Sequence, residues 1–69
     1  MSDVSRIGFI GLGNMGGPMA KRIIKSAPLV VFDIDQQRMD SIVALGAVAA
    51  DSPAEIARQS DLVLISLPD

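Results

Sequence analysis

One segment near the start of the chain constrains the fold most: an apolar run, three glycines and a helical pattern follow one another directly. Residues 7–10 read Ile-Gly-Phe-Ile, which is typical of a buried strand. Gly11, Gly13 and Gly16 come next and lead into an amphipathic pattern over residues 14–24. A G-x-G-x-x-G spacing alone is common, but between a strand and a helix it indicates a turn that receives a dinucleotide.

Each glycine of this turn has its own expected role. Gly11 would permit the tight turn, Gly13 would let a pyrophosphate approach the backbone, and Gly16 would let the helix pack closely on the strand. The N–H groups at the start of the helix would face the phosphates. The alternative is a sharp turn without a ligand, since glycine also serves strained backbone. The residues predicted to contact the cofactor here are Gly11, Leu12, Gly13, Asn14, Met15 and Gly16.

Composition excludes several other classes of protein. The 69 residues contain no cysteine and no histidine, so disulfides, thiolate catalysis and the usual zinc ligand sets are absent, and no metal site is expected. The formal net charge is −2 and the six Lys and Arg are scattered, unlike those of a nucleic-acid-binding protein. No apolar run suits a membrane helix, and the start of the chain lacks a secretory signal pattern. We expect a cytoplasmic protein without a membrane or nucleic-acid partner.

The rest of the chain continues as alternating strands and helices. Further strands are expected at residues 29–32, 47–49 and 62–67, and further helices at residues 37–45 and 53–59. With the opening segment, this order predicts an α/β fold. The expected fold is a partial Rossmann, doubly wound parallel sheet with strand order 3-2-1-4, truncated after the fourth strand.

Local signals support these boundaries. Ser52, Pro53 and Glu55 form a capping box at the start of the last helix. Gly46 stands where a left-handed residue would end the middle helix. Met19 lies on the apolar stripe of the first helix, and we expect it to pack in the core. Continuous apolar runs such as residues 29–32 and 62–67 are expected of strands that are covered on both faces.

An acidic residue follows the second expected strand at the spacing that dinucleotide sites use. Asp33 lies 20 positions after Gly13, where a carboxylate can reach the adenosine ribose hydroxyls and repel a 2′-phosphate. This spacing favours NAD, and Asp35 adds negative charge, although a helix N-cap is the better interpretation of Asp35. NADP stays possible because Arg38 is near and an arginine can accommodate a phosphate. An ordinary turn carboxylate is the alternative for Asp33.

The opening segment also resembles a known family. Residues 8–20, GFIGLGNMGGPMA, are similar to the glycine loop of the β-hydroxyacid dehydrogenases, particularly the 3-hydroxyisobutyrate dehydrogenase group, within the superfamily of the 6-phosphogluconate dehydrogenase NAD(P)-binding domain. The match includes the Met-Gly step, Pro18 and Met19. Residues 65–68, ISLP, resemble the family's fourth strand and the turn after it. The resemblance implies an oxidoreductase and cofactor contacts at Leu67 and Pro68, for which a simple strand terminator is the alternative.

The same resemblance implies hydride transfer at the nicotinamide, with motifs for catalysis that come after this segment. Lys21 and Lys25 do not match the family's catalytic lysine and are expected to be solvated helix charges. Ser66 has no base partner, and no catalytic residue is assigned. Residues 1–69 are therefore expected to be the N-terminal portion of a dinucleotide-binding domain, without the substrate domain, as a fragment or with a complementing chain. A stand-alone nonenzymatic dinucleotide-binding module and a structural βαβ domain are the alternatives.

Overall fold

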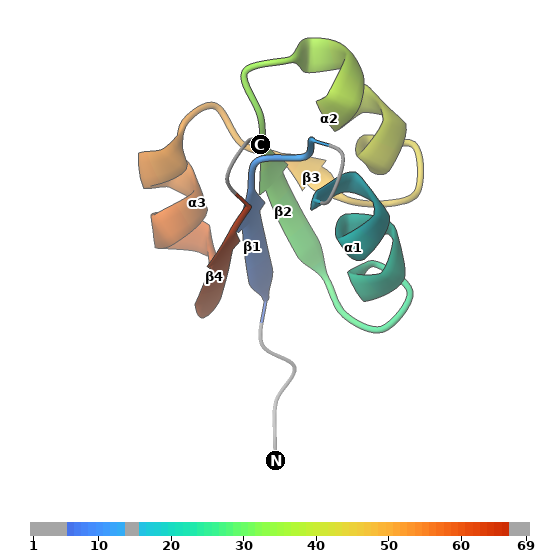
Figure 1. The fold of residues 1–69 in the computed structure, drawn as a ribbon. Coiled ribbons are helices and arrows are strands. Elements are labelled where there is room, and N and C mark those ends of the chain that lie inside the picture. Colours follow the sequence, from blue (N-terminus) through green and yellow to red (C-terminus); the bar gives the residue numbers. More distant parts are fainter. Residues whose placement is uncertain (1–5, 14–15, 67–69) are drawn as a thin grey trace.

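Four short apolar runs form the parallel sheet. In the computed structural model, which describes residues 6–13 and 16–66, the strands are β1 (Ile7–Ile10), β2 (Leu29–Phe32), β3 (Val48–Ala49) and β4 (Leu62–Ile65) (Figure 1). Every pairing between them is parallel, and their order is β3-β2-β1-β4. The predicted strand order is confirmed, and it places β1 inside the sheet with the glycine turn at its carboxyl end.

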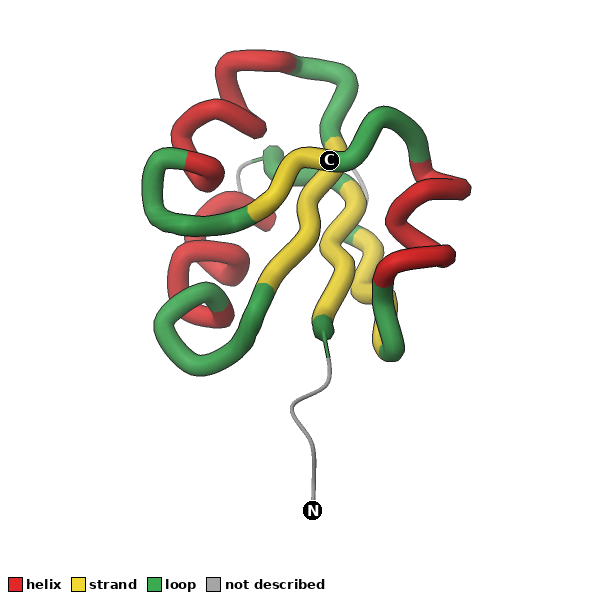
Figure 2. Tube along the Cα trace, turned by 180° about the vertical axis from the view of Figure 1, so that it is seen from behind, coloured by secondary structure: helices red, strands yellow, loops and turns green. Residues whose placement is uncertain are grey.

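Three helices cover the two faces of this sheet. They are α1 (Gly16–Ile23), α2 (Gln36–Val43) and α3 (Pro53–Gln59). Figures 1 and 2 show α1 and α2 on one face and α3 on the opposite face, so the fold has three layers. Along the chain, each helix connects one strand to the next parallel strand, as the alternation of elements predicts.

The sheet separates two apolar clusters because successive side chains of a strand point to opposite faces. Along β2, Leu29 and Val31 pack in the cluster beneath α1 and α2, whereas Val30 packs in the cluster beneath α3. The larger cluster consists of Phe9, Leu12, Ala20, Leu29, Val31, Met39, Ile42 and Ala47. The smaller cluster consists of Val30, Ala50 and Ile56. Thus β2 is covered on both faces, as expected.

Two helix ends have the capping residues that the sequence predicts. Ser52 Oγ accepts a hydrogen bond from the Glu55 backbone N–H at 3.2 Å, with Pro53 in the first turn of α3. Gly46 has φ +114°, the left-handed conformation expected of a residue that follows a helix. The bounds of α3 are those predicted, whereas α2 begins one residue earlier than expected, after Asp35, and ends at Val43.

Two expectations about burial are wrong. Met19 is 48% exposed, because the face of α1 that meets the sheet carries the small residues Gly16 and Ala20. On β4, Leu62 is 52% exposed and Ile65 is 65% exposed, so this strand is not covered on both faces. The reason is position, since β4 has a partner only on the β1 side within the described part of the sheet.

Candidate functional site

The turn after β1 depends on a glycine at its first position. Gly11 has φ +91°, a conformation that side chains with a Cβ rarely adopt. Its N–H donates to the Phe32 carbonyl oxygen at 3.0 Å, which ties the turn to the end of β2. A Cβ on Gly11 would collide with the Ser66 backbone carbonyl oxygen. The fold itself therefore requires glycine here, as the tight-turn role predicts.

Gly16 is also required by the fold, for a different reason. A Cβ on Gly16 would collide with the Gly11 carbonyl oxygen and would stand 3.1 Å from Phe9 Cε1. The first turn of α1 can lie this close to β1 only because position 16 lacks a side chain. The predicted role of Gly16 in close helix packing is confirmed by this geometry.

Gly13 differs from both neighbours in the motif. Its φ is not positive, and a Cβ placed on it would meet only Arg38 Nη1, at an ordinary contact distance of 3.7 Å. Because the guanidinium is the far end of a flexible side chain, the described part of the protein gives no steric reason for glycine at this position. Among the described residues, only the movable Arg38 guanidinium lies near the place where a Cβ of Gly13 would stand.

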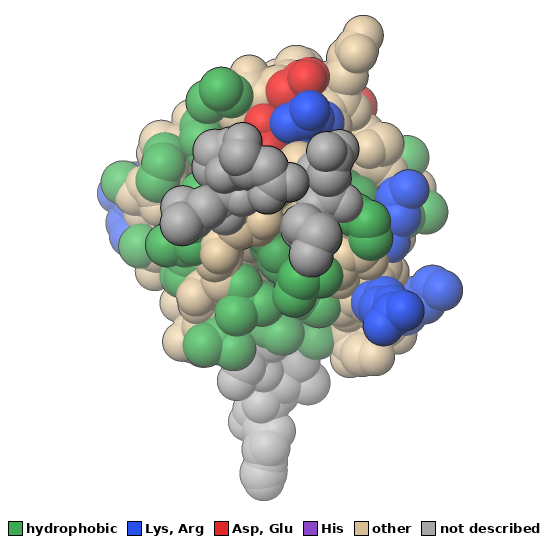
Figure 3. Space-filling model, in the orientation of Figure 1, with side chains coloured by type: hydrophobic (Ala, Val, Ile, Leu, Met, Phe, Trp, Pro, Cys, Tyr) green, Lys and Arg blue, Asp and Glu red, His purple; other side chains and the backbone are tan. Residues whose placement is uncertain are grey.

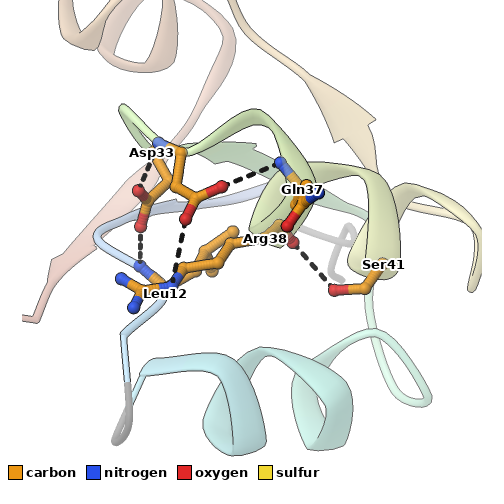
Figure 4. A network of polar contacts seen from close by, with 6 residues as sticks. Leu12, Asp33, Gln37, Arg38 and Ser41 are labelled. Atoms are coloured by element: carbon orange, nitrogen blue, oxygen red, sulfur yellow. Dashed lines mark hydrogen bonds and ion pairs between the residues drawn. The ribbon is translucent and has the colours of Figure 1, made fainter.

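Asp33 connects the glycine turn to the turn after β2 (Figure 4). It is only 7% exposed, and its Oδ2 accepts a hydrogen bond from the Leu12 N–H. That bond is 2.6 Å long, and Asp33 Oδ1 accepts a second bond from the Asp35 N–H at 2.8 Å. The structure thus places Asp33 beside the glycine turn, as predicted, and adds a structural role for its carboxylate.

This structural role and the position of Leu12 were not predicted. The Leu12 side chain is 3% exposed and packs in the larger apolar cluster, so only its backbone belongs to the surface of the turn. The sequence did contain a signal for this bond, namely an aspartate directly after β2. Because β1 and β2 are neighbouring parallel strands, that aspartate lies next to the N–H groups of the turn after β1. Spacing alone did not distinguish a carboxylate that binds ribose from one that binds the turn.

Asp35 and Arg38 form a second pair at the start of α2. Asp35 is the N-cap, and its Oδ1 accepts from the Gln37 N–H at 2.9 Å. Its Oδ2 lies 3.7 Å from Arg38 Nε in a half-exposed ion pair. In Figure 4 the Arg38 side chain reaches from α2 towards the loop that carries Leu12. Figure 3 shows basic and acidic side chains in contact at this end of the molecule.

The remaining predicted residues can be placed only in part. Asn14, Met15, Leu67 and Pro68 lie outside the described residues. Lys21 and Lys25 are exposed, in agreement with solvated helix charges. Within residues 6–13 and 16–66, no group of three or more His, Cys, Asp or Glu could hold a metal ion. No described helix is long and apolar enough to cross a membrane.

Comparison with curated proteins gives relatives that are dehydrogenases. The chain is 41% identical over 69 residues to the mitochondrial 3-hydroxyisobutyrate dehydrogenase of Rattus norvegicus, covering 99% of this chain and 21% of that protein. It is 44% identical over 66 residues to the NAD-dependent L-serine dehydrogenase of Pseudomonas aeruginosa, covering 94% of this chain and 22% of that protein. The chain thus spans about a fifth of the length of these relatives. A mitochondrial and a bacterial relative do not confirm the predicted cytoplasmic location.

Comparison with solved structures agrees with the fold. A reductive aminase from Aspergillus terreus, in complex with NADPH and ethyl-5-oxohexanoate, is 30% identical and aligns with a TM-score of 0.80. The alignment covers 97% of this chain and 24% of that chain. Residues 6–69 also match the family model described as the NAD binding domain of 6-phosphogluconate dehydrogenase. The match to an NAD binding domain confirms the predicted dinucleotide cofactor, NAD, and NADP stays possible because the aminase is in complex with NADPH; the chain belongs to this family of NAD-binding domains.

Proposed function

We propose that this chain forms the NAD(P)-binding segment of a dehydrogenase of the 3-hydroxyisobutyrate dehydrogenase type, with the glycine turn as its phosphate site. The pyrophosphate of NAD would lie against the backbone of Gly11, Gly13 and Gly16, and NAD would supply the hydride acceptor. The residues of this chain bind and orient the cofactor, and none of them is assigned to the chemical step. The relatives that are named dehydrogenases, and the resemblance at residues 8–20, support this assignment.

The observation that carries the proposal is the contrast between Gly13 and the other two glycines. Gly11 and Gly16 would collide with backbone atoms of the turn region if they carried a Cβ, whereas at Gly13 no such collision occurs with residues 6–13 and 16–66. A glycine of the motif that these residues do not require is explained by an external group. Close approach of a pyrophosphate to the backbone supplies that reason.

The start of α1 provides the complementary electrostatics. The helix begins at Gly16, and the Gly17 N–H already donates to the Gly13 carbonyl oxygen at 3.0 Å, which leaves the Gly16 N–H free among the described residues. This group and the positive end of the helix dipole favour an anion at this point. A pyrophosphate at the turn therefore does not need a basic side chain.

Asp33 supports NAD as the favoured cofactor. Its buried carboxylate already accepts two backbone hydrogen bonds, but an ionised carboxylate has about four acceptor positions and can accept ribose hydroxyls as well. The same negative charge would repel the 2′-phosphate of NADP. We therefore infer that NAD is preferred, and that the adenosine ribose lies on the Asp33 side of the turn.

Two glycine variants test this proposal because they separate binding from folding. Gly13→Ala should leave the free energy of unfolding unchanged or raise it by about 0.4–1 kcal/mol, since among the described residues only the movable Arg38 side chain lies near the methyl group. NADH affinity should fall about tenfold, the equivalent of one lost hydrogen bond to a charged group. Isothermal titration calorimetry gives the affinity, and urea denaturation followed by circular dichroism gives the stability.

Gly46→Ala is the matched control. Position 46 has φ +114° and a Cβ there meets nothing within 4 Å, so the cost is conformational, about 1 kcal/mol or more, and lies outside the glycine turn. NADH affinity at full folding should stay at the wild-type value. If Gly13→Ala binds NADH as tightly as the wild type, the pyrophosphate site is wrong. If the folded wild type binds no NADH, the structural βαβ alternative is favoured.

A further inference from the structure

A groove lies between α1 and α2 and is separate from the glycine turn. Lys21, Ile24 and Lys25 line it from α1 and the turn after that helix, and Ser41 and Leu45 line it from α2 and the turn after it. Helix α1 ends before β2 begins, and α2 ends before β3 begins, so both helices end near the amino ends of the strands. The glycine turn follows the carboxyl end of β1, at the opposite end of the sheet (Figure 1).

Two lysines give this groove a positive charge. Lys21 and Lys25 are exposed, and neither takes part in an ion pair within residues 6–13 and 16–66. The helical course continues past the end of α1, because the Ile24 N–H donates to the Ala20 carbonyl oxygen at 3.0 Å. Residues four apart on a helix lie on one side of it, so both ammonium groups can reach the same anion. Figure 3 shows basic side chains without acidic neighbours on the side of the molecule that carries α1.

The rest of the lining is mostly apolar. Leu45 is 53% exposed, and Ile24 is partly buried against the larger apolar cluster. Ser41 Oγ already donates its proton to the Arg38 carbonyl oxygen at 2.9 Å, so the lysines are the donors that an anion would use. The helix dipole favours cations at this end of α1, but it gives no reason for an exposed leucine beside them.

The size of the groove favours a small molecule as its occupant. Its volume is about 480 Å³, which lies within the range of about 300–1,000 Å³ of small-molecule sites. A stable protein interface instead takes about 20–30 residues a side. We propose that this groove binds an aliphatic carboxylate, with the carboxylate between Lys21 and Lys25 and the alkyl chain against Ile24 and Leu45. The proposal does not depend on the assignment of NAD to the glycine turn.

Titration of the full chain with sodium octanoate, followed by heteronuclear NMR of the backbone amides, tests the site. The Ile24 and Leu45 signals should shift and saturate below the concentration at which octanoate forms micelles. Octanoate should bind about fourfold more tightly than hexanoate, because each fully buried CH₂ contributes about fourfold and the two extra groups are half buried in an open groove. Acetate and 1-octanol, which each lack one half of the ligand, should bind more weakly than octanoate.

Variants of the lining separate the two halves of the site. Lys21→Gln combined with Lys25→Gln should weaken octanoate binding about fivefold, as expected of two exposed ion pairs. Leu45→Ala should weaken it about threefold through the lost apolar contact. Arg22→Gln is the matched control, since it removes a charge from an exposed position of α1 that does not line the groove, and it should leave the affinity unchanged. Circular dichroism confirms that each variant is folded.

Several results would overturn the inference. No saturable shift with octanoate would refute the site. An equal loss of affinity in Arg22→Gln and in the double lysine variant would show a general attraction of anions. Equal binding of 1-octanol and octanoate would refute the role of the lysines. Displacement of octanoate by NADH would place the ligand at the glycine turn, and Ile24 and Leu45 shifts that follow protein concentration alone would show a second copy of the chain in the groove.

Discussion

Replacing Asp33 should destabilise the fold before any cofactor is considered. Its carboxylate accepts hydrogen bonds from the Leu12 and Asp35 N–H groups, at 2.6 and 2.8 Å, and is 7% exposed. A hydrogen bond to a charged group contributes about 1.5–3 kcal/mol, so Asp33→Ala should cost about 3–6 kcal/mol. A domain of this length has a total stability of about 3–10 kcal/mol. The alanine variant should therefore lose a large part of this stability, and it should unfold if the wild type lies at the lower end of the range.

Asp33→Asn gives the measurable version of this prediction. The asparagine keeps one acceptor oxygen and presents an NH₂ group to the other N–H, so about 1.5–3 kcal/mol should be lost. Urea denaturation followed by far-ultraviolet circular dichroism suits the chain, because it contains no tryptophan or tyrosine for fluorescence. Asp61→Asn is the control, since the Asp61 carboxylate accepts one exposed hydrogen bond, from the Arg6 N–H at 3.0 Å.

The loss of stability in the Asp61→Asn control is the value that the loss in Asp33→Asn has to exceed. An exposed bond of this kind should contribute less than about 1 kcal/mol. If Asp33→Asn costs no more than Asp61→Asn, the carboxylate is not a structural link between the two turns, and the argument fails. A larger cost has a consequence for binding studies as well. A loss of NADH affinity in an Asp33 variant would then reflect a displaced turn as much as a lost ribose contact.

Two other predictions concern α3. Hydrogen bonding by Gln59, and then the charge of Arg58, hold the pKa of Glu55 below its ordinary value of 4.5. Because the pKa of Glu55 is lower in the folded protein than in the unfolded chain, its ionised form stabilises the fold above the unfolded-state pKa, and this stabilisation is lost as the pH falls through the folded-state pKa. Glu55→Gln should therefore flatten the fall in urea midpoint between about pH 6 and pH 3, and an unchanged slope would contradict this. Ser60 Oγ is buried and has no hydrogen-bond partner among residues 6–13 and 16–66, so Ser60→Ala should raise the free energy of unfolding by about 0.5–1 kcal/mol, and a decrease would show that the hydroxyl has a partner.

The parts of the fold that were predictable are those with local causes. The cap at Ser52 and the left-handed Gly46 depend on neighbouring residues only, and both lie where the sequence placed them. Strand order followed from alternating strands and helices, because parallel strands need crossovers. The placement of Asp33 beside the turn followed from spacing and topology together.

The helix face that meets the sheet was mispredicted for a reason that the sequence did contain. Hydrophobicity favoured Met19 as a core residue, yet it is 48% exposed. A glycine that allows close packing must itself face the strand, and Ala20, one turn later, then lies on the same face. The predicted role of Gly16 thus already determined which side of α1 is buried. On β4, exposure depends on what lies beyond the sheet edge, which the apolar run could not show.

Fold stability depends differently on two neighbouring carboxylates, because their exposure differs. Asp33 is buried and bonded to two turns, so replacing it changes the fold together with the site. Asp35 and Arg38 are half exposed and joined by one weak ion pair, so replacing either leaves the turns in place. Substitution of Asp35 or Arg38 is therefore expected to cost much less stability than substitution of Asp33. An Asp35→Asn variant that loses as much free energy of unfolding as Asp33→Asn would contradict this division of roles.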